Sequence, residues 1–203
     1  MPTHHPSQLV FAAATLICGL AGLSIGTSDA AAQSASPPNI VYILADDMGL
    51  GKTVQALGLI AIEKAAGRLA APVLVIAPTS LMVNWRREAE KFCPDLRVLT
   101  LQGSDRKSRF DEIDGSDVVL TTYPLIARDH EVLAQRQWHM ILLDEAQTIK
   151  NPNATTTKLI HRLTSSHRFC LTGTPLENHL GELWSLFHFV APGFLGELKR
   201  FNQ

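Results

Sequence analysis

The sequence has few cysteines, almost no net charge and no internal repeat. Of its 203 residues only three are cysteines, Cys18, Cys93 and Cys170, and their wide spacing implies no disulfide framework and is not that of metal ligands. The formal net charge is -1, so any contact with nucleic acid has to come from a local patch. No internal repeat is present. The 46% hydrophobic and 18% charged content is that of one globular α/β domain with a tail.

The first eight residues contain no Lys or Arg, although the segment after them resembles a secretory leader. Residues 9–25 form an apolar run, and small residues follow with an expected cleavage point near Ala32. A transmembrane anchor is the alternative interpretation, but the run is short and broken by glycines. We therefore predict a signal-peptide-like leader, disordered or helical, over residues 1–32 and a linker over residues 33–38. No stable membrane anchor is expected after cleavage.

From residue 39 onward strand and helix patterns alternate, which predicts a parallel sheet with helices on both faces. The predicted strands are residues 39–45, 73–77, 97–101, 117–121, 139–143 and 168–171. The predicted helices are residues 53–66, 81–92, 105–113, 124–134, 155–163 and 180–190.

A glycine-rich turn lies between the first predicted strand and the first predicted helix. It consists of Asp46, Asp47, Met48, Gly49, Leu50, Gly51, Lys52 and Thr53. Backbone N–H groups and the helix N-terminus bind phosphate in such a turn, a Lys reaches the terminal phosphates, and a Thr hydroxyl binds Mg²⁺. The strict phosphate-loop pattern has Gly where Asp46 stands, so the match is partial. The turn predicts a nucleotide site.

Two adjacent carboxylates, Asp144 and Glu145, follow the apolar residues 140–143. Carboxylates at the end of a buried strand are costly unless they meet a cation or take part in proton transfer. Asp144 would hold Mg²⁺ through its water shell, and Glu145 would orient and deprotonate an attacking water. The alternative is an acidic pair that caps a helix.

Small hydroxyl residues follow three other predicted strands. Thr79 and Ser80, and likewise Thr121 and Thr122, are suited to hold the backbone phosphates of a nucleic acid. Helix capping by Thr79 or Ser80 is the alternative. The third set, Thr172, Gly173 and Thr174, is suited to sense the γ-phosphate and to pass its state to neighbouring helices.

These segments together resemble the Swi/Snf-type ATPases, DNA translocases of helicase superfamily two. Residues 46–53, the Asp-Glu-Ala-Gln box at 144–147 and residues 171–178 resemble motifs I, II and III. Residues 78–85 resemble motif Ia, residues 121–123 resemble the next conserved block, and the similarity extends over about 43–203. Gln147 stands where many relatives have His.

The resemblance implies the first RecA-like lobe of such an enzyme, over residues 39–203, with ATP and Mg²⁺ as cofactors. It assigns Lys52, Asp144 and Glu145 to catalysis, residues 46–53 to the nucleotide, and Thr53 and Asp144 to the metal. The resemblance also assigns residues to the coupling of the nucleotide site with the DNA site, namely Gln147, Thr172, Gly173 and Thr174. Contact with duplex DNA is assigned to Thr79, Ser80, Thr121 and Thr122. The full family couples ATP hydrolysis to movement along duplex DNA.

Two parts expected of the family are missing from this sequence, namely the adenine-contacting segment before motif I and the second RecA-like lobe with its arginine fingers. Since an arginine finger is worth about 10³–10⁵ in rate, we expect a lone lobe to bind nucleotide and DNA weakly and to turn ATP over slowly or not at all. A second lobe would have to act in trans.

The start of the chain has a second resemblance. Residues 38–49 after the leader look like the beginning of a type I sulfatase, in which the paired Asp residues would bind calcium. No Cys-x-Pro-x-Arg segment follows, because residues 93–97 carry the proline one place too early. Gene fusion, a mis-assembled reading frame or deliberate construction could each join the two families at residues 43–49.

Three functions therefore stand after the sequence alone: a truncated ATP-binding lobe, a secreted sulfatase-like fragment, and a DNA- or partner-binding module without turnover. The two parts of the sequence predict different cellular locations. The ATPase body favours the cytoplasm or nucleoid, whereas the leader favours secretion.

Overall fold

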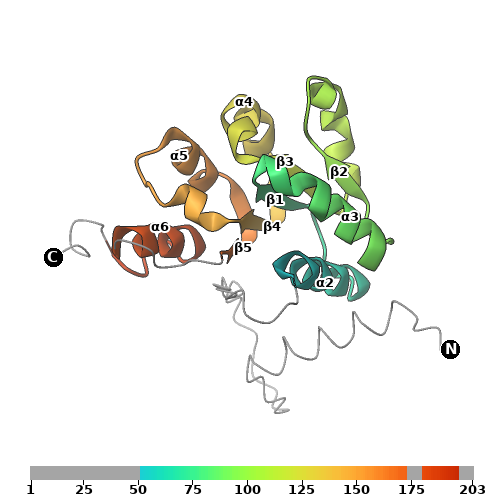
Figure 1. Ribbon diagram of the computed structural model, residues 1–203, viewed down its shortest axis with the longest axis horizontal. Coiled ribbons are helices and arrows are strands. Elements are labelled where there is room, and N and C mark those ends of the chain that lie inside the picture. Colours follow the sequence, from blue (N-terminus) through green and yellow to red (C-terminus); the bar gives the residue numbers. More distant parts are fainter. Residues whose placement is uncertain (1–50, 173–179, 197–203) are drawn as a thin grey trace, which may run out of the picture.

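The computed structural model describes residues 51–172 and 180–196, and within them the chain forms one parallel sheet between two layers of helices (Figure 1). The strand order is β2-β3-β1-β4-β5, and every neighbouring pair is parallel. The strands are β1 (Val73–Ala77), β2 (Val98–Thr100), β3 (Val118–Thr122), β4 (Gln137–Asp144) and β5 (Thr164–Leu171).

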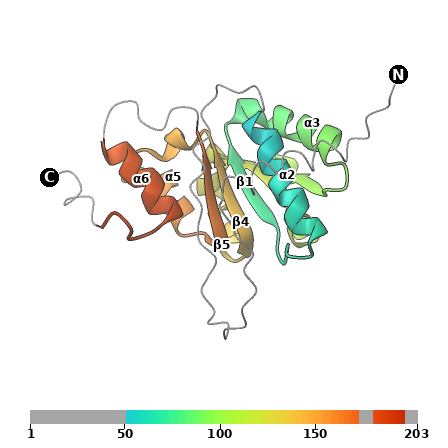
Figure 2. The ribbon, with the colours of Figure 1, turned by 90° about the horizontal axis from the view of Figure 1, so that it is seen from below.

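Alternating residues of the central strands divide the core between the two faces of the sheet. In β1, Val73 and Val75 belong to one buried cluster, and Leu74 and Ile76 belong to the other. The first cluster is completed by α2 (Lys52–Ala65) and α3 (Met82–Phe92), and the second by α4 (Tyr123–Ala134), α5 (Thr155–His161) and α6 (Leu180–Val190). Figure 2 shows α2 and α3 on one side of the sheet and α5 and α6 on the other. A sheet buried on both faces explains why its strands read as continuous apolar runs.

Three short 3₁₀ helices connect these elements: η1 (Thr79–Leu81), η2 (Asp105–Gly115) and η3 (Ala146–Ile149). A buried ion pair fastens η2 to α4, because the Arg106 guanidinium donates to both carboxylate oxygens of Asp129, at 2.7 and 2.9 Å. The same guanidinium donates to the carbonyl of Gly103. Hydrogen bonding to Asp129 raises the pKa of Arg106, so the guanidinium is charged at all ordinary pH values.

The predicted parallel α/β sheet with helices on both faces is confirmed, and the bounds of β1 and α6 agree with the predicted segments. Other boundaries differ. The helix predicted at 105–113 is a 3₁₀ helix that extends over Asp105–Gly115, with only Arg106 and Ile113 buried. β5 begins four residues before the predicted start, since the exposed half of this strand carries no apolar pattern. The predicted strand 39–45, the leader and the linker lie outside the described residues.

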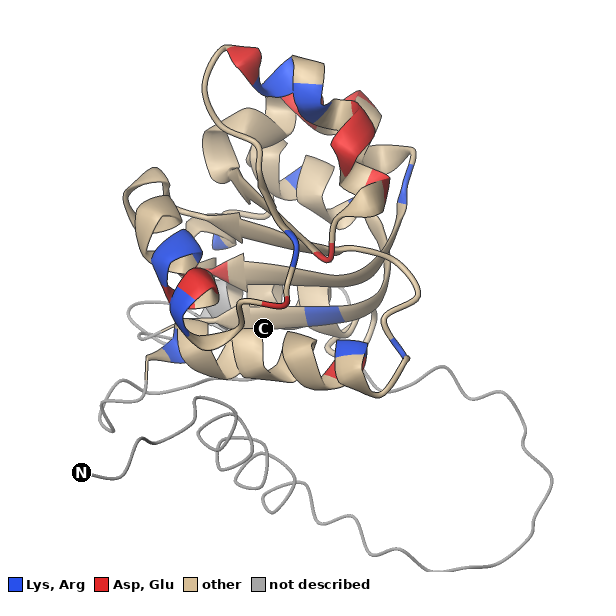
Figure 3. Ribbon diagram, turned by 90° about the vertical axis from the view of Figure 1, so that its right-hand side faces the viewer, with Lys and Arg blue, Asp and Glu red and all other residues tan. Residues whose placement is uncertain are grey.

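Charged residues are mixed along the described elements rather than gathered by sign, as the view in Figure 3 shows. This arrangement agrees with the net charge of -1. In the described part of the chain, no helix has the length and apolar character needed to span a membrane.

Candidate nucleotide site

The site forms where the strands of the sheet end. Because all five strands are parallel, their carboxyl ends share one edge, and the polar residues that follow them meet there. β4 ends in Asp144, β5 is followed by Thr172, and α2 begins at Lys52. The structure thus brings together three groups of predicted site residues that are far apart in the sequence.

Asp144 is held rigidly and almost wholly buried. It is 3% exposed, and its Oδ2 accepts a hydrogen bond of 2.8 Å from the indole N–H of Trp85. Its Oδ1 accepts the backbone N–H of Glu145 at 3.0 Å. Burial raises the pKa of Asp144, and the bond from Trp85 opposes that rise only in part. A cation beside this carboxylate would favour its ionised form.

Glu145 adopts an unusual backbone conformation that turns the chain at the end of β4. Its φ of 49° and ψ of 55° are left-handed, and it is the only non-glycine residue with positive φ among those the structure describes. Its carboxylate is partly exposed. Oε1 lies 4.0 Å from the Nζ atom of Lys52, and Oε2 accepts a 2.7 Å hydrogen bond from the side-chain amide of Gln147.

Gln147 links the acidic pair to the end of β5. While its amide nitrogen donates to Glu145, its carbonyl Oε1 accepts a hydrogen bond of 2.9 Å from the hydroxyl of Thr172. Thr172 is fully buried. The predicted coupling residues Gln147 and Thr172 are therefore connected to Glu145 by an unbroken chain of hydrogen bonds. Gly173 and Thr174 lie outside the described residues.

The start of α2 is suited to an anion. Gly51 precedes the helix, no side-chain hydrogen bond caps it, and its first turn has no acidic residue. The helix N-terminus and the Lys52 ammonium both contribute positive potential at this point. Thr53 is buried, at 8% exposure. Residues 46–50, the rest of the predicted phosphate turn, are outside the described range.

The four residues predicted to contact DNA divide into two pairs. Thr79 and Ser80 are exposed in η1, as a phosphate contact requires. Thr121 and Thr122 are 0% and 2% exposed, and their contact with DNA stays a prediction. β3 runs on to Thr122 and α4 begins at the next residue, with no loop between them.

The sequence interpretation missed two aromatic residues of this site. Trp85 binds the carboxylate of Asp144, and the phenol of Tyr123 donates to the backbone carbonyl of Asp144 at 2.8 Å. Both residues lie in segments that resemble family motifs, but no role was assigned to them. A buried indole or phenol needs a hydrogen-bond acceptor, and this need is the signal that could have identified them.

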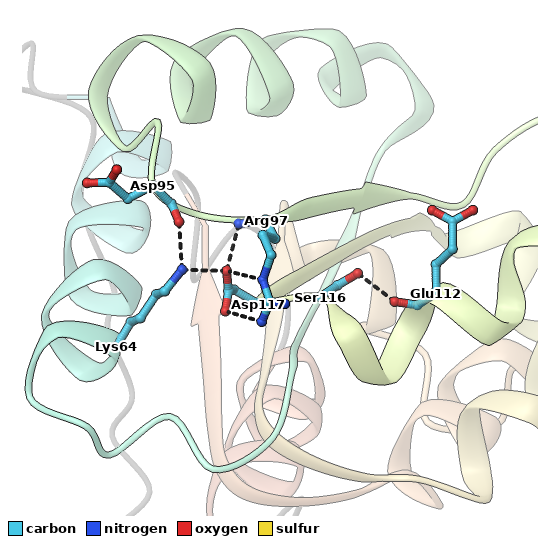
Figure 4. Close-up of polar contacts among 6 residues, drawn as sticks. All are labelled: Lys64, Asp95, Arg97, Glu112, Ser116 and Asp117. Atoms are coloured by element: carbon cyan, nitrogen blue, oxygen red, sulfur yellow. Dashed lines mark hydrogen bonds and ion pairs between the residues drawn. The ribbon is translucent and has the colours of Figure 1, made fainter.

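A hollow of about 500 Å³ lies at the opposite, amino edge of the sheet, and its lining includes Pro72, Arg97, Asp117 and Gln137. Three residues of its lining, Arg97, Ser116 and Asp117, have polar partners (Figure 4). Asp117 accepts hydrogen bonds from Lys64 at 2.7 Å and from the backbone and guanidinium of Arg97. Burial acts to raise the pKa of Asp117, but these bonds outweigh it and lower the pKa. This network connects α2 to the residues that precede β2 and β3. The candidate site is therefore the carboxyl edge.

Comparison with known proteins identifies the family. The model of the SNF2-related domain matches residues 33–203. The putative ATP-dependent helicase/translocase YwqA of Bacillus subtilis is 45% identical over 163 residues, which are 79% of this chain and 18% of that protein. Helicase domino of Drosophila melanogaster is 37% identical over 79% of this chain and 5% of its own length. The chain thus spans less than a fifth of these relatives.

Solved structures agree with the sequence comparison. The Sulfolobus solfataricus SWI2/SNF2 ATPase core in complex with dsDNA matches with a TM-score of 0.72 and 41% identity, over 80% of this chain and 33% of that one. The Sulfolobus solfataricus SWI2/SNF2 ATPase core domain matches with a TM-score of 0.67 and 40% identity, over 79% of this chain and 32% of that one. The predicted RecA-like fold is therefore confirmed, and the chain belongs to the SNF2-related domain family.

Proposed function

We propose that this chain is the ATP-binding lobe of a DNA-dependent ATPase and that it holds Mg-ATP at the carboxyl edge of its sheet. The observation that carries the proposal is the 4.0 Å separation of Lys52 Nζ and Glu145 Oε1. It joins a helix N-terminus suited to phosphate with an acidic pair suited to a metal and a water. The names of the relatives, which include ATP-dependent helicases, support it.

The residues present suit a magnesium–triphosphate group. Mg²⁺ is commonly held by one or two carboxylates together with substrate phosphates, rather than by a complete protein cage. In the described part of the chain, no group of three or more His, Cys, Asp or Glu is placed to hold a metal ion. Asp144 offers a fixed, buried carboxylate, and Thr53 lies at the start of α2.

Each residue has a separate role in the proposal. Lys52 binds the β- and γ-phosphates, and Thr53 and Asp144 hold the metal. When bound, Mg²⁺ neutralises charge that develops on the transferred phosphoryl group. Glu145 orients a water and accepts its proton, and Gln147 and Thr172 fix the Glu145 carboxylate from the side of β5. The proposal also assigns residues 46–50 to the nucleotide and Gly173 and Thr174 to coupling.

We propose duplex DNA as the macromolecular partner of the η1–α3 segment. Thr79 and Ser80 are exposed there, and Arg86 and Arg87 are exposed on the helix that follows. Such a local group of hydroxyl and guanidinium donors suits phosphates in a chain with no overall basic charge. Movement along DNA, and a second RecA-like lobe as its partner, are proposed for the longer protein to which the relatives correspond.

The domain limits remain predictions. We place the lobe at residues 39–203, after a leader at 1–32 and a linker at 33–38, and the sulfatase-like start at residues 38–49 falls outside the described residues. An ATPase that acts on DNA would work inside the cell, in the cytoplasm or nucleoid, whereas a functional leader would export it.

A titration of the full chain with ATP and Mg²⁺ tests the proposal. Replacement of Lys52 by Ala should weaken binding about 10- to 150-fold, because a hydrogen bond to a charged group is worth about 1.5–3 kcal/mol. Lys107→Ala, which removes an exposed lysine of η2, is the matched control and should bind like the wild type. Glu145→Gln should retain binding, because its role lies in the chemical step.

Two results would overturn the proposal. One is a folded wild-type chain that shows no saturable binding at millimolar Mg-ATP. The other is a Lys52→Ala variant that binds as tightly as Lys107→Ala.

A further inference from the structure

The indole of Trp85 makes a contact that its packing does not explain. Trp85 lies in α3, is fully buried, and belongs to the core cluster beneath α2 and α3. A phenylalanine would supply the same kind of apolar packing. The indole additionally directs its N–H at Oδ2 of Asp144, at 2.8 Å.

The other two tryptophans of the chain form a useful contrast. Trp138 is also fully buried, and its N–H donates to the backbone carbonyl of Leu133 at 3.0 Å. Trp184 donates to the backbone carbonyl of Gly196 at 3.1 Å. Backbone carbonyls are the ordinary partners of buried indoles. Trp85 therefore differs from both in donating to an ionisable side chain.

This bond limits the orientations open to the carboxylate of Asp144. One of its oxygens is held by the backbone N–H of Glu145 and the other by the indole of Trp85. Two donors fixed to different elements define the plane of the carboxylate, while each oxygen keeps a further lone pair for another ligand. The indole is a suitable clamp, because it is rigid and fully enclosed by the core.

We propose that Trp85 is a positioning residue that orients Asp144 for the magnesium ion of Mg-ATP. The inference rests on the proposed function and adds a residue that acts through Asp144. Groups that hydrogen-bond to metal-binding side chains fix their orientation, and their removal commonly lowers metal affinity 10- to 100-fold. Removal of the Trp85 indole should thus lower the affinity for Mg²⁺ more than it lowers the affinity for ATP.

Titrations of the full chain with ATP, in excess Mg²⁺ and in EDTA, separate the contribution of Mg²⁺ to the affinity from that of the nucleotide alone. Trp85→Phe should reduce the gain in affinity that Mg²⁺ provides by about 10-fold or more, while ATP binding in EDTA changes less than about twofold. Trp138→Phe is the matched control, since it also removes one buried indole N–H, and should retain the full gain. Urea unfolding of both variants verifies that each is folded.

A spectroscopic measurement on the wild-type chain does not depend on the folding of any variant. The three indole N–H groups each give a resolvable ¹⁵N–¹H signal, and the Phe variants assign those of Trp85 and Trp138. Addition of Mg²⁺ to the ATP-bound chain should shift the signal of Trp85 and leave that of Trp138 unchanged.

An unchanged Trp85 signal, or a Trp85→Phe variant with the wild-type gain from Mg²⁺, would show that the indole only fills the core. A wild-type chain that binds ATP in neither condition would instead overturn the proposed function itself. The two failures are therefore distinguishable.

Discussion

Because the backbone of Glu145 is left-handed, we predict that Gly at this position gives a more stable protein than Ala, the reverse of the usual order. A non-glycine residue in this conformation costs about 1–2 kcal/mol, because Cβ crowds the following carbonyl. Replacement of Glu145 by Gly removes that cost, whereas replacement by Ala keeps it. Both changes delete the same contacts with Lys52 and Gln147, so these contributions cancel when the two variants are compared.

The expected difference follows from two opposing terms. Relief of backbone strain favours Gly by about 1–2 kcal/mol, and the lower conformational entropy of the unfolded chain favours Ala by about 0.4–1 kcal/mol. The Glu145→Gly variant should therefore be more stable than Glu145→Ala by about 0.8 kcal/mol, the difference between the midpoints of the two ranges. At an ordinary helical position the order is reversed, with Ala favoured by about 0.5–1 kcal/mol.

Gly58 provides that reference position within the same chain. It lies in α2, and a Cβ added there would meet no atom within 4 Å, so Gly58→Ala should raise stability. Urea unfolding measures both pairs, and with an m-value of about 1–3 kcal/mol/M the midpoints should differ by a few tenths of a molar unit. If Glu145→Ala proved as stable as Glu145→Gly, the strain argument would be refuted.

Two further predictions concern groups away from the nucleotide. Asp129→Ala should lower the free energy of unfolding by about 3–5 kcal/mol, because it leaves the Arg106 charge buried without its partner. The double variant Arg106→Met with Asp129→Leu should lose less than Asp129→Ala in the same urea assay, and an equal or larger loss would contradict the explanation. The pKa of His161 is lowered from 6.5 to about 4, first by burial and then by the charges of His188 and Arg168, so the folded state keeps this ring neutral. As the pH falls below 6.5, His161 of the unfolded chain becomes protonated before His161 of the folded chain. The free energy of unfolding should therefore decrease between pH 6.5 and pH 4, by about 2 kcal/mol at pH 5. The variant His161→Asn should lose this part of the pH dependence.

The layered fold could be predicted from the sequence because its strands are buried on both faces and bounded by polar turns. Residues 73–77 and 180–190 show such limits clearly, and the structure has the same bounds for β1 and α6. The segment 105–115 could not be assigned a helix type, since a short polar stretch is held by tertiary contacts such as Arg106 with Asp129 rather than by its own periodicity.

Side-chain directions at the sheet edge were harder to predict than the edge itself. The spacing of the motifs indicated that Lys52 and the acidic pair would meet, because parallel strands end together. It did not reveal that Thr121 and Thr122 are buried, which depends on where β3 stops and α4 starts. Nor could it reveal the bond from Trp85 to Asp144, which depends on how α3 crosses the sheet.

The two adjacent carboxylates differ in their surroundings, and the difference suits two separate tasks. Asp144 is buried, fixed by Trp85 and the backbone, and has a raised pKa that a cation would reverse. Glu145 is 31% exposed in its side chain, and its hydrogen bond comes from a partly buried amide rather than from the rigid core. Neighbouring acidic groups with unlike environments commonly divide the work of a site between them.

Gln147, the residue that connects Glu145 to the end of β5, has a side chain suited to both of its partners. Gln147 must donate to Glu145 and accept from Thr172 at the same time. A side-chain amide does both at any pH, whereas a carboxylate at this position could only accept and would repel Glu145. A neutral imidazole also has one donor and one acceptor, which agrees with the resemblance to relatives that carry His here. A group with both a donor and an acceptor therefore suits this position, where it connects the hydroxyl of Thr172 to the carboxylate of Glu145.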